Sequence, residues 1–284
     1  MTISSSLRAS LFVAILCVAP ATWSGASAET LQIPKANYVS EEDGFTVSFL
    51  ARDTTTGTEY VLEGSDLDTR HVPWSTFKIP NLVLALETNV AASLRAWRDW
   101  NPAQRPAAAH WPAEWQEGQD LGTAFARSSV WYFQDLALDV GTDTYRTKLA
   151  EWHYGDGEVP DGSDDFWLDG SLTISVREQV DFLGKLLTGR LGVSAASLAA
   201  LNEASRSGRA GEGHLHGKTG AGPDDPSKTD GSFSGWYAGY ILRDDRPLVV
   251  FALHMAGPSF TSIRDARRAL VVRLLADLRL SYTP

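Results

Sequence analysis

The chain has 284 residues, 43% of them hydrophobic, and a formal net charge of −10. A protein this acidic repels phosphate backbones, which argues against nucleic acid as a partner. No polybasic segment is present, so stable association with an anionic membrane is not expected either, and the length suits one large domain or two intergrown lobes.

The first 28 residues have the pattern of a secretory signal peptide. Arg8 supplies a positive charge, Leu11 to Ala19 is a short apolar stretch, and Ala26-Ser27-Ala28 has the small residues of a cleavage site. An uncleaved anchor or a buried core segment is the alternative, but a membrane span takes about 20 apolar residues. The only cysteine, Cys17, would leave with the signal. The mature chain, residues 29–284, is therefore predicted to be secreted, into a bacterial periplasm, without disulfides.

Strands are predicted at both ends of the mature chain. Phe45 to Leu50 alternates apolar and polar residues, and Thr58 to Leu62 follows a Thr-Gly turn. Near the carboxyl end, Trp236 to Leu242 is aromatic and β-prone, and Pro247 to Met255 is a nearly continuous apolar run typical of a buried strand. Residues 243–246 predict a hairpin, so the last two strands are expected to be antiparallel.

Helices are predicted mainly in the middle of the chain, in a helical insert over about residues 85–205. Residues 75–96 are expected to form a helix, and the Pro- and Ala-rich stretch from Asn101 to Ala113 a loop. Leu172 to Leu187 has helical spacing, with Thr173 or Ser175 as its cap, and a last helix is expected over about 260–279.

This order of elements predicts an α+β fold. An antiparallel sheet made from both chain ends would be flanked by terminal helices, with a mostly helical subdomain inserted between its halves. Such an arrangement can place a cleft between the sheet and the subdomain.

Ser75-Thr76-Phe77-Lys78 is the first motif with catalytic potential. Positions i and i+3 of a helix share a face, so the Ser75 hydroxyl and the Lys78 amine can meet. Lysine can take the serine proton only when burial lowers its pKa by several units from about 10.4. Alone, the motif is more often a serine cap before a solvated lysine. The chain has only 6 lysines against 19 arginines, however, so a lysine at this spacing is unusual here.

Two further motifs offer hydroxyls and a cation. A hydroxyl of Ser128-Ser129-Val130 could relay a proton to a leaving amine, although a helix cap is the more usual role. Lys218-Thr219-Gly220 offers a cation and a hydroxyl to a carboxylate, and its glycine lets a strand edge approach a ligand closely. A glycine-rich loop with an exposed lysine is the alternative.

In this order, separated by about 50 and then about 90 residues, the motifs resemble those of the penicillin-recognising serine enzymes. Ser128-Ser129-Val130, in place of Ser-Asp-Asn, is similar to the class D, oxacillinase-type β-lactamases. The resemblance covers about residues 40–280. The other segments that carry it are Pro73 to Asn81, Trp131 to Gln134, Tyr154 to Asp156, Phe166 to Leu172, Glu178 to Leu183 and Gly235 to Tyr240.

The resemblance implies the penicillin-recognising fold and the hydrolysis of a β-lactam substrate through an acyl-enzyme on Ser75. It implies that Lys78 is N-carboxylated by CO2 and acts as general base, with Trp167 donating its indole N–H to the carbamate. Val130 and Leu168 would form walls of the pocket. Beyond this modification no cofactor is expected.

The remaining roles also follow from the resemblance. Ser128 would pass a proton towards the leaving nitrogen, and the backbone N–H groups of Ser75 and Ala221 would form the oxyanion hole. The residues implied to bind the substrate are Lys218, Thr219, Gly220 and Arg264.

Three features depart from the family's pattern. Asp156 replaces an asparagine, and a carboxylate near the pocket could raise the pKa of a neighbouring lysine. Trp74 precedes the nucleophile where a small residue is expected. The loop from Ala221 to Ser234 is long, which could alter the substrate range or be only a solvated insertion.

Other functions stay open at this point. A penicillin-sensing domain would be acylated without turnover, and a D,D-peptidase would cleave cell-wall peptides instead. A metal hydrolase is not expected, because His214 and His216 share a strand face without further ligands at metal spacing.

Overall fold

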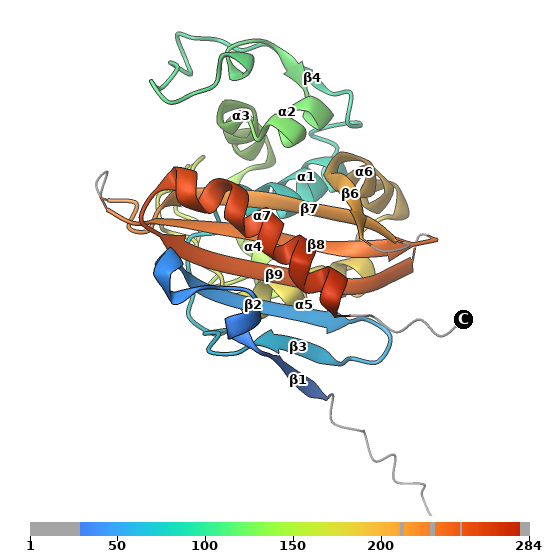
Figure 1. Cartoon of the computed structure of the whole chain (residues 1–284). Coiled ribbons are helices and arrows are strands. Elements are labelled where there is room, and N and C mark those ends of the chain that lie inside the picture. The colour runs from blue at the N-terminus through green and yellow to red at the C-terminus, as the bar shows by residue number, and fades with distance from the viewer. Residues whose placement is uncertain (1–28, 211–212, 228–230, 245, 279–284) are drawn as a thin grey trace, which may run out of the picture.

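A seven-stranded sheet made from both ends of the chain is the middle layer of the computed structural model (Figure 1). The structure describes residues 29–210, 213–227, 231–244 and 246–278, so the predicted signal peptide lies outside the described residues. The strand order is β1-β3-β2-β9-β8-β7-β6. The strands are β1 (Thr30–Ile33), β2 (Thr46–Asp53), β3 (Glu59–Leu62), β6 (Arg206–Ala210), β7 (Gly213–Pro223), β8 (Phe233–Arg243) and β9 (Arg246–Gly257).

Strand pairing confirms the predicted antiparallel sheet, with one difference at its edge. β2, β3, β9, β8, β7 and β6 pair antiparallel, and β8 and β9 form the predicted hairpin. β1 instead pairs parallel with β3. The amino-terminal segment therefore adds a short edge strand and two single-turn 3-10 helices, η1 (Lys35–Asn37) and η2 (Glu41–Asp43).

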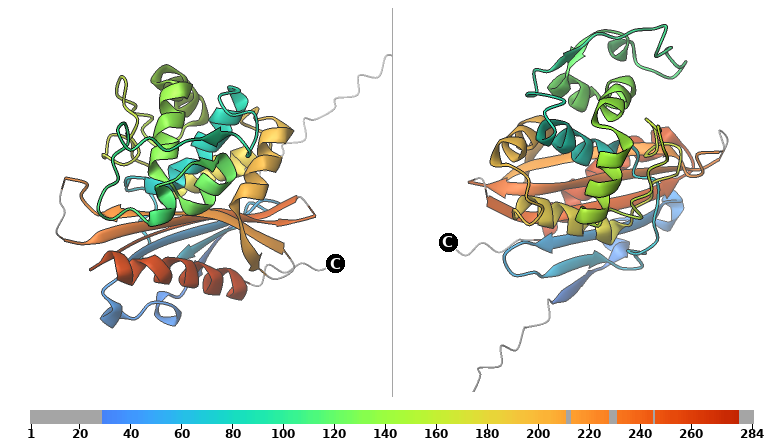
Figure 2. Two further views of the ribbon diagram at one scale, coloured as in Figure 1. Left: turned by 90° about the horizontal axis from the view of Figure 1, so that it is seen from above. Right: turned by 180° about the vertical axis from the view of Figure 1, so that it is seen from behind.

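Helices cover both faces of the sheet (Figure 2). α7 (Phe260–Asp277) lies on one face, and the other helices lie on the opposite face. No described helix is both long and apolar enough to cross a bilayer. The elements of the second face are η3 (Trp74–Phe77), α1 (Lys78–Glu87), α2 (Leu121–Arg127), α3 (Val130–Val140), α4 (Thr142–Trp152), α5 (Val176–Leu187) and α6 (Ala195–Ser205), with η4 (Ala113–Trp115), β4 (Trp97–Arg98) and β5 (Gln119–Asp120) in the connections.

The helix predicted over residues 75–96 is shorter than expected. It begins with the 3-10 turn η3, and α1 ends at Glu87, shortly before Asn89 takes the left-handed conformation with φ 58°. A left-handed residue cannot continue a right-handed helix. The helix predicted up to Leu187 is confirmed as α5, with a capping box at Ser175.

The sheet separates two hydrophobic clusters. Along β9, Val250 and Ala252 belong to the larger cluster on the helical side, and Phe251 and Leu253 to the smaller cluster under α7. A strand covered on both faces buries every side chain, which is why its sequence is a nearly unbroken apolar run. The larger cluster fills the space between the sheet and helices α1 to α6, and it surrounds the start of α1.

Candidate active site

The start of α1 brings the first motif together. Because η3 and α1 follow one another without a break, Ser75 and Lys78 lie on one face. Lys78 Nζ donates a hydrogen bond of 3.0 Å to Ser75 Oγ. Ser75 is partly exposed, whereas Lys78 is completely buried. A hydroxyl that solvent can reach thus contacts an amine that solvent cannot reach.

Burial lowers the pKa of Lys78 well below its usual value, and the nearby Lys218 cation lowers it further. The Lys78 amine also lies 5.2 Å from the centre of the Phe133 ring. An apolar surrounding disfavours the ammonium form, so the amine is poised to accept a proton. This is the property that the Ser-x-x-Lys motif needs to activate its serine.

Hydrogen bonds fix the turn that carries Ser75. Trp236 Nε1 donates to the Val72 carbonyl over 2.9 Å, and Thr76 Oγ1 donates to the Pro73 carbonyl over 2.6 Å. Gln179 Nε2 from α5 in turn donates to Thr76 Oγ1 over 2.9 Å. The nucleophile is therefore held by both the sheet and the helical layer, as a preorganised site requires.

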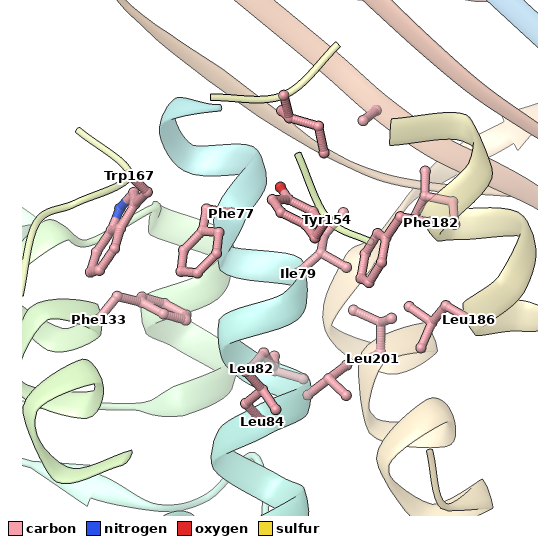
Figure 3. Packing of buried hydrophobic residues seen from close by; sticks show 14 of the residues in the cluster. Phe77, Ile79, Leu82, Leu84, Phe133, Tyr154, Trp167, Phe182, Leu186 and Leu201 are labelled. Carbon is pink, nitrogen blue, oxygen red and sulfur yellow. The ribbon is translucent and has the colours of Figure 1, made fainter. Parts of the chain in front are cut away.

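Aromatic rings, among them Phe77, Phe133 and Trp167, pack around the start of α1 (Figure 3). Phe77 stacks on Trp167, with ring centroids 5.2 Å apart and an angle of 19° between the planes. Trp167 is completely buried, and its Nε1 has no hydrogen-bond partner. A buried N–H without an acceptor is costly, so this atom offers a place for a further acceptor close to the start of α1.

The second and third motifs meet although 90 residues separate them. Ser128 ends α2 in the left-handed conformation, with φ 62°. Lys218 Nζ donates to Ser128 Oγ over 3.0 Å and to the Thr219 carbonyl over 3.1 Å. Burial, together with the positive charge of Arg267, lowers the pKa of Lys218 to about 7. One hydroxyl–lysine pair thus lies at the start of α1, and the other joins the helical subdomain to the sheet.

β7 presents an edge to the nucleophile. β8 pairs along the whole of one edge of β7, whereas β6 pairs on the other edge only with residues 213–216. In the described structure no strand therefore pairs with that second edge at residues 217–223. A Cβ added to Gly220 would lie 2.8 Å from the Ser75 backbone nitrogen. Only glycine allows this close approach, which brings the backbone of Ala221 next to the nucleophile turn.

Val130 and Leu168, the predicted walls of the pocket, each lie next in sequence to a part of the site. Val130 is the first residue of α3, directly after the Ser128-Ser129 turn, and is partly exposed. Leu168 follows Trp167 and packs, half-buried, against the larger hydrophobic cluster. Both side chains are thus partly accessible to solvent.

Arg264 is not brought together with the other predicted residues. Its guanidinium is half-exposed on α7 and pairs with Asp265 over 2.9 Å. Arg267, one turn further on, is instead buried, lies against Gly235 of β8 and perturbs the pKa of Lys218. Arg264 was predicted by counting residues from the last strand and stays a prediction, whereas the phase of the helix turns Arg267 towards the sheet.

Arg267 forms no ion pair within the described part of the chain. Its Nε has no hydrogen-bond partner, and no described carboxylate forms an ion pair with Arg267 or Lys218. Burial lowers the pKa of Arg267 to about 10. A buried cation without an ion-pair partner favours the binding of an anion. A signal was present in the sequence, because Ile263, Arg267, Leu270 and Leu274 share one helical face.

Asp156 has a local structural role. Its carboxylate accepts hydrogen bonds of 3.1 Å from the Thr173 N–H and 3.2 Å from the Glu158 N–H. Its charge is not among the causes that shift the pKa of Lys78. Asp156, at the position where the family has asparagine, therefore holds a loop together. It does not raise the pKa of Lys78.

Metal ligands do not gather within the described residues, where no cluster of three or more His, Cys, Asp or Glu side chains could hold an ion. His214 contacts the Arg206 guanidinium at 3.0 Å, and His216 stacks on Tyr240 at 5.1 Å. Each histidine thus has a separate protein partner.

Fold and site together define a penicillin-recognising serine enzyme. Residues 47–275 match the family model described as penicillin binding protein transpeptidase domain. The chain is 34% identical over 191 residues to regulatory protein BlaR1 of Bacillus licheniformis, a match that covers 66% of this chain but 30% of that protein.

Two further comparisons identify which class of penicillin-recognising enzyme the chain resembles. The chain is 31% identical over 204 residues to β-lactamase OXA-48 of Klebsiella pneumoniae, covering 72% of each chain. The crystal structure of a class D β-lactamase from Sebaldella termitidis aligns with a TM-score of 0.78 and 25% identity, over 90% of this chain and 100% of that one. The chain belongs to the class D β-lactamase family.

Proposed function

We propose that this protein hydrolyses β-lactam antibiotics through an acyl-enzyme on Ser75. The observation that carries the proposal is the 3.0 Å contact between the accessible Ser75 hydroxyl and the buried Lys78 amine. Family membership supports it, because OXA-48 and the Sebaldella protein are named as β-lactamases.

Acylation uses the two hydroxyl–lysine pairs in sequence. The base at Lys78 accepts the Ser75 proton while Ser75 Oγ attacks the β-lactam carbonyl carbon. The ring C–N bond then breaks, and the nitrogen receives a proton from Ser128, which takes one in turn from the contacting Lys218. The base at Lys78 passes its proton back to Lys218 and is free again. It then takes a proton from the water that attacks the acyl carbon and gives that proton to the leaving Ser75 oxygen.

The negative charge on the carbonyl oxygen needs donors at the nucleophile turn. The backbone N–H groups of Ser75 and Ala221 are the proposed pair, supported by the close approach of β7 at Gly220. Removal of one such donor typically lowers the rate by about 10²–10³.

We also propose that Lys78 is N-carboxylated by CO2. The neutral amine that this reaction needs fits the lowered pKa of Lys78, and the unpartnered Trp167 Nε1 fits a donor to an added anion. The carbamate would supply an anionic oxygen base for both half-reactions. Trp167 and Phe77 keep water from the lysine side of the site.

The substrate carboxylate is proposed to bind Lys218, Thr219 and Arg267. Arg267→Ala is expected to raise KM for a penicillin at least about tenfold, because truncating one member of a buried charge pair typically costs 2–5 kcal/mol. Arg264→Ala is the matched control, with KM expected within about twofold since exposed ion pairs contribute little. Steady-state kinetics with a penicillin and its methyl ester check this. A larger loss for Arg264→Ala would restore the original assignment.

A second function is favoured by one comparison, the 34% identity to a regulatory protein. A sensor would be acylated once and retain the acyl group. Absorbance turnover of a chromogenic cephalosporin separates the two: hydrolysis is expected to continue for many equivalents of substrate. A single stoichiometric burst would support the sensor, and cleavage of D-Ala-D-Ala peptides would support the peptidase.

For its compartment we propose export to a bacterial periplasm. The support is the signal-peptide pattern of residues 1–28 and the removal of the only cysteine with it.

A further inference from the structure

Trp74, the residue before the nucleophile, has an unusual backbone conformation. Its φ is 49°, a left-handed value that bulky side chains rarely adopt. The side chain is 7% exposed, and its Nε1 has no hydrogen-bond partner. Backbone strain and an unsatisfied buried donor persist only where the surroundings enforce them, and they are concentrated at functional sites.

The Trp74 indole lies against β7. A Cβ added to Gly222 would fall 2.3 Å from Trp74 Cζ2 and 2.4 Å from Cη2. No side chain fits at distances of this kind, so the ring occupies the space that a residue at 222 would need. Trp74 and Gly222 are therefore matched to each other.

Gly220, two residues earlier on β7, makes the neighbouring contact. A Cβ there would lie 2.9 Å from the Pro73 carbonyl oxygen as well as against the Ser75 nitrogen. Residues 220 and 222 lie on one face of the strand, because side chains alternate. Ala221 lies between them and packs its methyl group against the cluster under α7.

The strand segment that holds Ala221 thus rests on two supports from the nucleophile turn. At Gly220 the support is the backbone of residues 73–76, and at Gly222 it is the Trp74 ring. The ring thickness sets how closely the strand can approach at its outer end. Strand and turn carry the two proposed oxyanion donors, the N–H groups of Ala221 and Ser75.

We propose that Trp74 is a positioning residue that sets the spacing of the oxyanion hole, acting through Gly222. This inference rests on the proposed function. The strained backbone places the indole under the strand rather than in the pocket, so that Ala221 stays aligned with Ser75 when negative charge develops on the substrate oxygen.

A double-mutant cycle between Trp74 and Gly222 tests the proposal. Gly222→Ala is expected to lower kcat for a chromogenic cephalosporin at least about 30-fold, since misplacing an oxyanion donor costs on this scale. Trp74→Gly, which suits a positive φ, is expected to lower kcat about tenfold. In the Trp74→Gly background, Gly222→Ala should cost less than about threefold because the ring is gone.

Binding of a boronic acid supplies a second readout. The serine hydroxyl adds to the boron atom of a boronic acid and forms a tetrahedral anion. The oxyanion donors stabilise the negative charge of this anion. Their affinity should therefore fall in parallel with kcat, while KM changes by less than about threefold. A merely structural role would lower the thermal midpoint without this parallel loss.

Two controls make the cycle specific. Gly220→Ala should be equally harmful in both backgrounds, because it meets backbone rather than the ring. Gly184→Ala on α5, whose nearest contact would be 3.9 Å away, should leave kcat unchanged. Trp74→Ala is the second background should Trp74→Gly not fold.

Additive costs of Trp74→Gly and Gly222→Ala would overturn the proposal, as would an unchanged kcat in Trp74→Gly. If the unsubstituted protein neither turned over the cephalosporin nor bound the boronic acid, the proposed function itself would fail, and this inference with it.

Discussion

Ser75→Ala is expected to abolish β-lactam hydrolysis, with kcat falling on the order of 10⁴–10⁶-fold, as for other enzymes that lose a serine nucleophile. The physical reason is that no other hydroxyl contacts the Lys78 amine in the described structure. The Ser75 side chain is partly exposed and, within the described residues, hydrogen-bonds only to Lys78, so the fold should be retained. Steady-state turnover and mass spectrometry of the acylated protein are the measurements.

Ser207→Ala is the matched control, because Ser207 on β6 is also partly buried and hydrogen-bonded, at 3.0 Å to Tyr237. It should hydrolyse the substrate at nearly the unsubstituted rate. Residual turnover of Ser75→Ala above about 1% of the original would point to a different nucleophile and refute the assignment.

Lys78→Met is expected to lower kcat by at least about 10³-fold, since general-base catalysis typically contributes 10²–10⁴. The same change should stabilise the fold. The unfolded chain carries a protonated lysine at pH 7, whereas burial lowers the pKa of Lys78 in the folded protein. Each unit of that difference costs the native state about 1.4 kcal/mol, and an apolar methionine avoids the cost.

The sign of the pH dependence distinguishes this explanation. Because the folded pKa of Lys78 lies below the unfolded one, the unfolded state binds more protons between the two values. The stability of the original protein should therefore rise with pH in that window, and the rise should be smaller in Lys78→Met. Thermal unfolding in bicarbonate-free buffer from pH 6 to pH 9 measures both, with the exposed Lys148→Met as control.

Bicarbonate tests the carbamate separately. At low pH without CO2 the unsubstituted protein should lose activity and regain it when bicarbonate is added, whereas Lys78→Met should not respond. Activity indifferent to CO2 would refute N-carboxylation and leave the amine itself as the base.

Local patterns in the sequence predicted what depends on local geometry. The contact between Ser75 and Lys78 follows from helical spacing, and the hairpin of β8 and β9 follows from two apolar runs around a short polar turn. Ser175 was predicted as one of two possible caps, and the capping box selects it.

Long-range packing could not be predicted in the same way. The contact of Ser128 with Lys218 joins the helical layer to the sheet, and only the family resemblance indicated it. The rotation of α7 about its axis determines which of Arg264 and Arg267 faces the sheet. The number of residues that separate them from β9 does not determine that rotation. The left-handed Trp74 is likewise a product of tertiary contacts, because β7 returns to the turn more than 140 residues later.

The buried Lys218 amine, which forms no ion pair with a described carboxylate, has a practical consequence for the resting enzyme. If sulfate, phosphate or chloride binds there, it must leave before a substrate carboxylate enters. Apparent affinity for penicillins should then depend on which buffer salt is present, and less so in Arg267→Ala. The salts around the enzyme thereby help to determine how efficiently it hydrolyses an antibiotic that is present at low concentration.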